Sequence, residues 1–138
     1  MFDHCLYFNT AALARQLERL WSEAYKPFGL TAAQGFLLRA VLQRPGILQG
    51  QLAEALAISR PTATRALDGL VVKAFVTRQA SHADGREIEV HPSASALALQ
   101  VPLGKASEAI STRIKGVIGE AQFADLVIGV RDVRSALK

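Results

Sequence analysis

The chain has 138 residues, of which half are hydrophobic and 20% are charged. This length fits one domain of ordinary size, and so apolar a composition in a small chain favours burial of surface between subunits. The net charge of +4 is compatible with a polyanionic partner, although many equally basic proteins bind none. A single cysteine excludes an internal disulfide and a multi-cysteine zinc site.

The first residues, from Met1 to Cys5, lack the basic start, the apolar stretch and the cleavage site of a signal peptide. No stretch reaches the length that a membrane span requires. We therefore expect a chain that makes no membrane contact. A reducing cytoplasm is the expected location, since it also fits the single cysteine.

Two helices are predicted at the start of the chain. Residues 8–25 carry apolar side chains at helical spacing, and Pro27 and Gly29 end that helix. Thr31 is then expected to cap a second helix over residues 32–43, because its hydroxyl can accept from a free backbone N–H.

The next stretch predicts a helix-turn-helix. Residues 49–56 and 59–73 form two short helical patterns, with residues 57–58 as a tight connection. Ser59 can cap the second helix, and Pro61 is tolerated in its first turn, where no hydrogen-bond donor is needed. Small alanines on the facing sides let the two helices approach closely.

The period then changes from helical to two. Residues 75–80 and 86–91 predict strands, joined by a turn over residues 81–85. From Ser93 onward the pattern is helical again, in two segments, and Pro102 is expected to kink the first of them. No internal repeat or linker divides the chain. The expected order is four helices, a hairpin and two helices, a mainly α fold of the α+β class.

The second helix of the helix-turn-helix carries side chains that suit the major groove of DNA. Arginine can donate two hydrogen bonds to guanine, and the segment from Ser59 to Arg86 has a net charge of +3. Asp84 and Gly85 are explained by a tight turn alone, but beside Arg86 the hairpin tip can enter the minor groove. We predict DNA contacts from Ser59, Arg60, Pro61, Thr62, Thr64, Arg65, Lys73, Arg78, Asp84, Gly85 and Arg86.

Four short segments carry a resemblance to a known family. They are residues 29–34 (GLTAAQ), residues 52–56 (LAEAL) leading to Ser59, residues 64–70 (TRALDGL) and residues 84–86 (DGR). Together they resemble the MarR (multiple antibiotic resistance regulator) family of winged helix-turn-helix transcription factors, over nearly the whole chain. Each segment alone is weak, and the combination is specific.

The sequence departs from the pattern of that family at two places. Ala74 stands where the family usually has a glycine that adopts a left-handed conformation at a helix end. We therefore expect a joint between the helix and the wing that is either slightly strained or differently shaped. Residues 91–93 (HPS) replace the usual Leu-Thr-Pro entry into the next helix, and a similar turn capped by Ser93 is expected.

The resemblance implies a division of roles along a single domain that spans the chain. Residues 59–73 would be the recognition helix and Arg86 the wing arginine, within a DNA-binding lobe of residues 29–92. Residues 1–28 and 93–138 would form the dimerisation helices. A homodimer would then bind an inverted repeat in double-stranded DNA, with its recognition helices in successive major grooves, and would usually block transcription.

The resemblance also implies an effector, either a small aromatic acid or phenol or an oxidant, that binds one spacing of the two lobes better than another. Trp21, Tyr25 and Phe36 are candidates to line its pocket, although aromatic residues at helical spacing are more often core. Cys5 is a candidate oxidant sensor, because some family members sense hydroperoxides with a cysteine near the start of the first helix. A sensor needs an accessible thiolate, and a lone cysteine near a terminus is more often inert.

Two other classes of function compete with this interpretation. An enzyme is not expected, because the histidines His4, His82 and His91 are scattered, Cys5 has no evident triad partner and no phosphate-binding glycine loop is present. No cofactor or metal is expected either. The alternative is a winged-helix module that binds a ligand or a protein without reading DNA. Salt-dependent DNA binding separates the two, since phosphate contacts release counterions.

Overall fold

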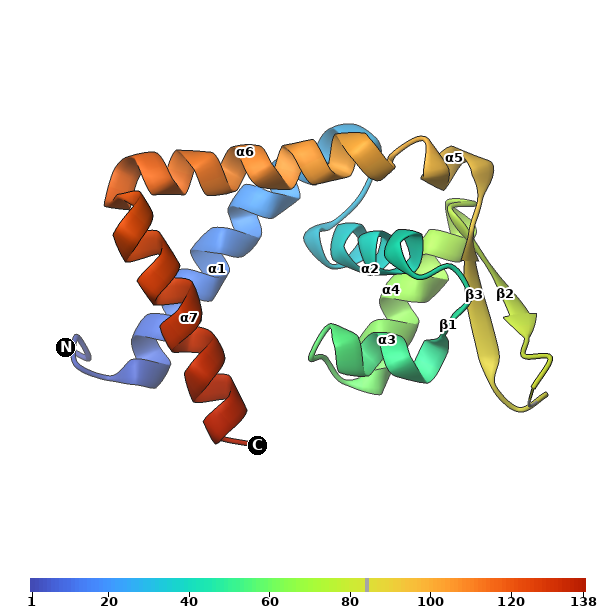
Figure 1. Ribbon diagram of the computed structural model, residues 1–138, viewed down its shortest axis with the longest axis horizontal. Helices are drawn as coiled ribbons and strands as arrows, with labels where there is room; N and C mark the ends of the chain where they lie inside the picture. Colours follow the sequence, from blue (N-terminus) through green and yellow to red (C-terminus); the bar gives the residue numbers. More distant parts are fainter. Residues whose placement is uncertain (84) are drawn as a thin grey trace.

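The structure, a computed structural model, describes residues 1–83 and 85–138 as a lobe of short helices and strands with a helical arm (Figure 1). The helices are α1 (Leu6–Tyr25), the 3-10 helix η1 (Lys26–Phe28), α2 (Ala32–Gln43), α3 (Gln49–Ala55), α4 (Arg60–Val72), α5 (Ala94–Leu97), α6 (Gln100–Ile118) and α7 (Glu120–Ala136). The strands are β1 (Ile47–Leu48), β2 (Val76–Ala80) and β3 (Ile88–Pro92).

The wing is a three-stranded antiparallel sheet in which β3 lies between β1 and β2. Val90 of β3 pairs with Ile47 on one side and with Arg78 on the other. Val90 and Ile47 are buried, so this face of the sheet joins the core of the lobe. The sequence predicts only the β2–β3 hairpin, and it misses β1 because two residues give no alternating pattern.

The helical pattern after the wing divides into α5, α6 and α7, so the expected two helices are wrong. The hydroxyl of Ser93 accepts from the N–H of Ala96 at 3.2 Å, which confirms the predicted cap. The kink expected at Pro102 is also wrong. Pro102 lies in the first turn of α6, where an N–H has no partner within the helix, and the chain breaks before it at Leu99.

Tyr25, the last residue of α1, is fully buried where the arm meets the lobe. A Cβ added to Gly35 of α2 would stand 2.2 and 2.3 Å from two carbons of the Tyr25 ring. The absence of a side chain at Gly35 therefore lets the ring lie directly on α2. Around it the core collects apolar residues of every layer of the lobe: Leu30, Leu37, Leu38, Val41, Leu52, Leu67, Leu70, Val76, Val90 and Leu103.

The caps predicted from the sequence set the start of α2. Thr31 accepts from the N–H of Gln34 at 3.1 Å, and Gln34 accepts in return from the N–H of Thr31 at 3.2 Å. These reciprocal bonds form a capping box. After η1, Gly29 has a left-handed φ of 70° and turns the chain into α2, as the sequence predicts.

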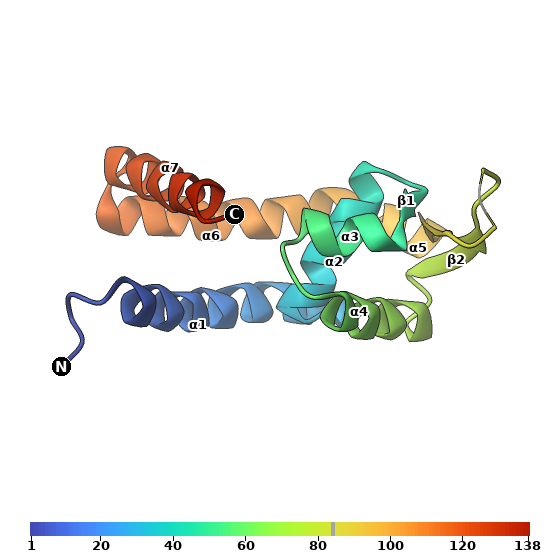
Figure 2. The same ribbon diagram turned by 90° about the horizontal axis from the view of Figure 1, so that it is seen from below.

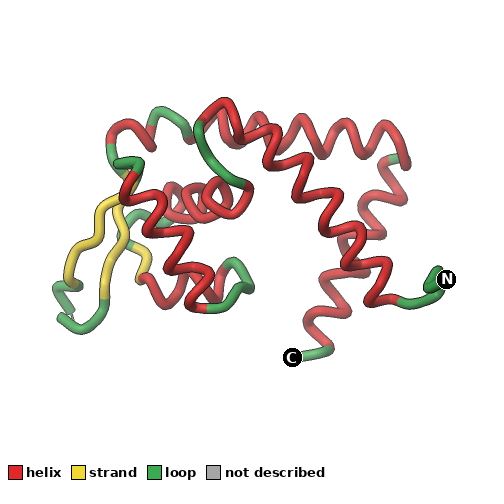
Figure 3. The backbone as a smooth tube through the Cα atoms, turned by 180° about the vertical axis from the view of Figure 1, so that it is seen from behind, coloured by secondary structure: helices red, strands yellow, loops and turns green. Residues whose placement is uncertain are grey.

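The arm consists of α1, α6 and α7, with α6 packed against both of the others. Figure 2 shows α7 beside α6 with α1 on the other side, and Figure 3 shows both chain ends on the side of the arm. The indole Nε1 of Trp21 in α1 donates to the hydroxyl of Ser107 in α6 at 3.1 Å. In α7 no residue is buried, and its exposed apolar side chains are Leu126, Val127, Ile128, Val130 and Val133.

Of the helices in the described part of the chain, none combines the length and the apolar character needed to cross a membrane.

The close contact between Gly35 and Tyr25 predicts that Gly35→Ala destabilises the fold. The added methyl group would force the buried ring aside, so the free energy of unfolding should fall by about 1–3 kcal/mol. Urea-induced unfolding measures this change. Gly104→Ala in α6 is the matched control, because its Cβ meets nothing within 4 Å. That substitution should raise stability by about 0.5–1 kcal/mol, since glycine weakens a helix interior. Equal effects of the two substitutions would contradict the close fit at Gly35.

Candidate nucleic-acid interface

The turn between α3 and α4 is closed by two backbone hydrogen bonds. Ala57 has a left-handed φ of 54°, and its N–H donates to the carbonyl of Glu54 at 3.1 Å. The N–H of Ile58 donates to the carbonyl of Ala53 at 3.1 Å. This pair of bonds is a Schellman motif, in which glycine is the preferred left-handed residue. Alanine adopts that conformation at a cost of about 1 kcal/mol, so packing between α3 and α4 must hold the turn.

Ser59 caps the first turn of α4, as the sequence predicts. Its hydroxyl accepts from the N–H of Thr62 at 3.2 Å and donates to the hydroxyl of Thr62 at 2.8 Å. Pro61 lies within the first two positions of the helix, where its fixed φ suits the helix and its missing N–H is not needed. The sequence thus defines the start of the predicted recognition helix closely.

The other end of α4 repeats the geometry of the turn. Ala74 has a left-handed φ of 60°, and its N–H donates to the carbonyl of Val71 at 3.0 Å. Phe75 donates to the carbonyl of Leu70, also at 3.0 Å. The strained joint expected at Ala74 is confirmed, and it directs the chain from α4 into β2.

The N-terminal half of α4 presents basic and hydroxyl side chains along one edge of the lobe. Arg60 and Arg65 are exposed, and Arg65 donates from Nη2 to the hydroxyl of Thr62 at 3.4 Å. In Figure 1 the start of α4, α3 and the tip of the wing lie along the lower edge, while α6 runs along the upper edge. A groove of about 480 Å³ between α3, α4 and β3 is lined by Arg60, Thr64 and Arg86, among others.

The predicted residues of the wing tip lie on the loop between β2 and β3. Gly85 and Arg86 are exposed, and Arg86 lines the groove just described. Asp84 lies outside the described residues. The loop therefore places Arg86 within the same surface as the start of α4, as a wing that accompanies a recognition helix would require.

Two predicted DNA contacts have their charged groups engaged within the protein. Lys73, the C-cap of α4, donates from Nζ to Gln34 Oε1 at 2.7 Å and to the carbonyl of Gly29 at 2.5 Å. Arg78 of β2 pairs with Asp68 of α4 and donates to Gln49 of α3. The structure thus brings Arg60, Thr64 and Arg86 together at one groove. Thr62 and Arg65 contact each other in the same half of α4, and Lys73 lies at the other end of that helix.

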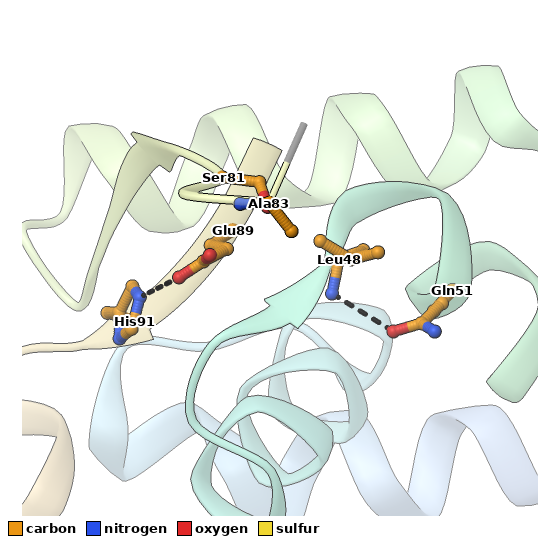
Figure 4. Close-up of polar contacts among 6 residues, drawn as sticks. All are labelled: Leu48, Gln51, Ser81, Ala83, Glu89 and His91. Carbon is orange, nitrogen blue, oxygen red and sulfur yellow. Dashed lines mark hydrogen bonds and ion pairs between the residues drawn. The ribbon is translucent and has the colours of Figure 1, made fainter. Parts of the chain in front are cut away.

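Figure 4 shows polar contacts within the central strand β3 and at the start of α3. His91 Nε2 lies 3.0 Å from Glu89 Oε1, and this hydrogen bond is the main reason that the pKa of Glu89 is lowered from its ordinary value. At the start of α3, the N–H of Leu48 donates to Gln51 Oε1 at 3.2 Å. Leu48 and Gln51 line the groove of Arg60 and Arg86, so this bond fixes the start of α3 there, whereas the Glu89–His91 contact lies within β3.

The three aromatic residues predicted to line an effector pocket meet at the junction of arm and lobe. The Phe36 ring lies 6.3 Å from that of Trp21 and 5.9 Å from that of Tyr25. Tyr25 is core, and Phe36 lines a groove of about 390 Å³ between α2, α3 and α6. Arg39 lines the same groove, with its guanidinium 5.6 Å from the centre of the Phe36 ring and Nη1 donating to the Tyr25 hydroxyl at 3.2 Å.

Cys5 is exposed and serves as the N-cap of α1, where its Sγ accepts from the N–H of Phe8 at 3.5 Å. A cap role alone accounts for this position. Oxidant sensing by Cys5 stays a prediction.

Sequence reasoning missed Arg39 and Gln49. Arg39 follows Phe36 by three residues and therefore shares a face of α2 with it, so helical spacing could have indicated the pair. Gln49 gives no such signal, because its partner Arg78 is distant along the chain and only the fold brings the two together. Within the described residues, no cluster of His, Cys, Asp or Glu side chains could hold a metal ion.

Comparisons with known proteins agree with this geometry. A model of the MarR family matches residues 28–87. An uncharacterized HTH-type transcriptional regulator of Bacillus subtilis (strain 168), YybA, is 33% identical over 66 residues, which are 48% of this chain and 44% of YybA. The match to this curated relative therefore spans less than half of its length.

Two solved structures share the fold over almost the full chain. The S. aureus MepR–DNA complex has a TM-score of 0.85 at 18% identity and covers 95% of this chain and 96% of its own. PcaV of Streptomyces coelicolor, in complex with its natural ligand, has a TM-score of 0.86 at 16% identity and covers 100% of this chain and 97% of its own. At such identities the likeness establishes the fold, here the winged helix-turn-helix with its flanking arm. Residues 28–87 are thus similar in sequence to the MarR family, and the whole chain has the fold of these two structures.

Proposed function

We propose that the chain is a dimeric transcriptional repressor that binds an inverted repeat in double-stranded DNA. The observation that carries the proposal is the groove that Arg60 of α4 and Arg86 of the wing line together, with Arg65 exposed in the same half of α4. Side chains at the start of such a helix can reach base edges in the major groove, while a basic wing reaches the adjacent minor groove. The proposed contacts are Ser59, Arg60, Pro61, Thr62, Thr64, Arg65, Gly85 and Arg86.

Electrostatics supports a polyanionic ligand for this edge. Most of the net charge of the chain lies between Ser59 and Arg86. Arg60 and Arg65 are exposed on α4, so their guanidinium groups can contact phosphates or bases without breaking a buried ion pair. The MepR structure of the same fold is a DNA complex, which agrees with a DNA ligand for this lobe.

The arm supplies the proposed dimer interface, made of residues 1–28 and 93–138. The apolar residues of α7 are exposed in the single chain, and exposed Tyr7 and Phe8 lie near the start of α1. Burial of such an apolar surface against a second copy is favourable and is typical of obligate dimers. Two-fold symmetry would then place the two α4 helices in successive major grooves.

We further propose that an aromatic acid binds at the junction of arm and lobe and releases the DNA. Phe36 offers an aromatic wall and Arg39 a cation in the groove between α2, α3 and α6. A carboxylate could pair with the guanidinium of Arg39 while its ring packs on Phe36. Because α6 belongs to the arm and α3 to the lobe, an occupant of this groove would favour one relative placement of the two.

DNA titration tests the proposed function directly. The purified protein should bind the intergenic DNA upstream of its own gene more tightly than a scrambled fragment, and the affinity should fall steeply with salt. Fluorescence anisotropy at several salt concentrations measures both effects. Equal, weak binding to the two fragments would favour the winged-helix module that does not read DNA.

Arg65→Ala should weaken specific binding by about 1–3 kcal/mol if Arg65 donates two hydrogen bonds to a guanine. Lys105→Ala is the matched control and should leave affinity unchanged, since Lys105 is an exposed cation of α6, and this helix runs along the edge opposite to the start of α4 (Figure 1). Equal losses for Arg65→Ala on specific and scrambled DNA would mark a phosphate contact instead.

The dimer proposal predicts a change of oligomeric state for Val130→Lys. A lysine in the apolar face of α7 would place a charge in the buried interface, so the dimer should dissociate. Sedimentation equilibrium measures the association. Val72→Lys, at an exposed valine at the end of α4, is the control and should remain dimeric. A Val130→Lys variant as dimeric as the wild type would place the interface elsewhere.

Arg39→Gln should abolish DNA release by aromatic acids, because the neutral amide cannot pair with a carboxylate. Release would be measured by anisotropy with benzoate and salicylate as probes. DNA affinity without the probe should not change, since Arg39 lies at the junction and not at the basic edge. If the wild type is released by these acids and Arg39→Gln responds equally, the acid binds at another site.

A further inference from the structure

Arg78 of β2 joins three elements of the lobe at once. Its Nη2 pairs with Asp68 Oδ1 on α4, and its Nε donates to Gln49 Oε1 on α3 at 3.2 Å. Gln49 is the first residue of α3, and Asp68 lies in the second half of α4. The planar guanidinium thus spans the strand that leads to the wing tip, the recognition helix and the helix before it.

The fork of Arg78 suits this arrangement because its donors point in fixed directions. Two donors of one rigid plane serve two acceptors on different helices, so the angle of β2 relative to both helices is constrained. The Arg78 side chain is only 28% exposed, whereas that of Asp68 is 56% exposed. The guanidinium is therefore less accessible to a DNA phosphate than those of Arg60 and Arg65, which lie exposed on α4.

Backbone hydrogen bonds help to fix the wing at its base. Phe75 bonds to the carbonyl of Leu70 at the start of β2, and Ser93 bonds to the carbonyl of Phe75 at the end of β3. Arg78 lies two residues further along β2 than Val76, closer to the tip. A side-chain contact at this point opposes rotation of the hairpin about its base, and that rotation would carry Arg86 away from the start of α4.

We propose that Arg78, through Asp68 and Gln49, is a positioning residue that sets the wing relative to the recognition helix, and that it acts on DNA binding without contacting DNA. This inference deepens the proposed function and rests on it. It also departs from the sequence-based prediction that Arg78 touches DNA.

Asp68→Asn separates the two roles by the sign of its effect. Removal of a carboxylate from a DNA-binding edge should strengthen binding if charge alone matters. If Asp68 holds Arg78 in place, specific affinity should instead fall by about two- to five-fold, the range expected for a partly exposed ion pair. Glu54→Gln is the matched control, because Glu54 is an exposed carboxylate of α3 in the groove that Arg60 lines, and its removal should leave binding unchanged or stronger.

Arg78→Lys and a charge exchange complete the test. Lysine keeps the positive charge but not the fork, so its affinity should fall as for Asp68→Asn, while the slope of log affinity against log salt stays at the wild-type value. Arg78→Gln removes the charge as well, so loss of a phosphate contact would reduce that slope by about 0.9, whereas loss of a positioning contact would leave it unchanged. The double variant Asp68→Arg/Arg78→Asp has the net charge of the wild type and re-forms the pair, so it should recover affinity to within about two-fold of the wild type.

DNA titrations would be run at a temperature well below the thermal unfolding midpoint of every variant. Loss of an ion pair that only stabilises the fold would then lower that midpoint without changing the affinity for DNA. Asp68→Asn binding as tightly as the wild type, or a reduced salt slope for Arg78→Gln, would overturn the proposal. Hydrogen exchange of the β2 amides without DNA gives a second readout, and we expect faster exchange in Asp68→Asn and in Arg78→Lys than in the wild type. If the wild type does not prefer its upstream DNA, the proposed function fails. Unchanged hydrogen exchange in the variants would then also overturn the positioning role of Arg78. Faster exchange would support that role even so.

Discussion

The ring of Tyr25 lying on Gly35 is the contact on which the arrangement of this molecule depends. Tyr25 ends α1, the first helix of the arm, and Gly35 belongs to the first helix of the lobe. A flat ring on a bare backbone leaves little freedom to slide, because the ring is fully buried and its hydroxyl accepts from Arg39. Tyr25 thus closes the core and accepts a hydrogen bond from Arg39, which lines the groove proposed for an effector. A ligand at Arg39 would act on the joint itself, without a relay through the rest of the protein.

Rigidity within the lobe has a different origin from rigidity at the joint. The turns before and after α4 each contain an alanine in a left-handed conformation, Ala57 before the helix and Ala74 after it. Glycine would adopt this conformation without strain. Core packing and the paired backbone hydrogen bonds must hold these two turns. The orientation of α4 therefore depends on how well the core is packed. The Arg78 contact adds a constraint on the wing from its polar side. The shape of the proposed DNA-binding edge therefore depends on Ala57, Ala74 and Arg78, which are not among the proposed DNA contacts.

The sequence predicts most local structure because local structure is determined by neighbours. The caps at Thr31, Ser59 and Ser93 follow from short-range hydrogen-bonding rules. The joint at Ala74 was expected only from the family resemblance, because alanine itself gives no signal for a left-handed residue. The strand β1 and the separate helix α5 were missed, since elements this short carry no readable period. The partners of Arg78 and Lys73 were missed for another reason: Gln49 and Gln34 come close to them only after folding, and a lone cation in a sequence looks equally suited to phosphate or to carbonyl.

Trp21 is the only tryptophan of the chain, and it lies where the arm meets the lobe. Its indole N–H bonds to Ser107 of α6 while its ring neighbours Phe36 of α2, so it touches the two helices between which any movement of the arm must occur. Its emission is sensitive to the polarity around the indole and to loss of that hydrogen bond. The protein thus has a single intrinsic fluorophore at the junction of arm and lobe. Movement of the arm relative to the lobe can be followed in the unlabelled protein by the emission maximum and the quenching of Trp21.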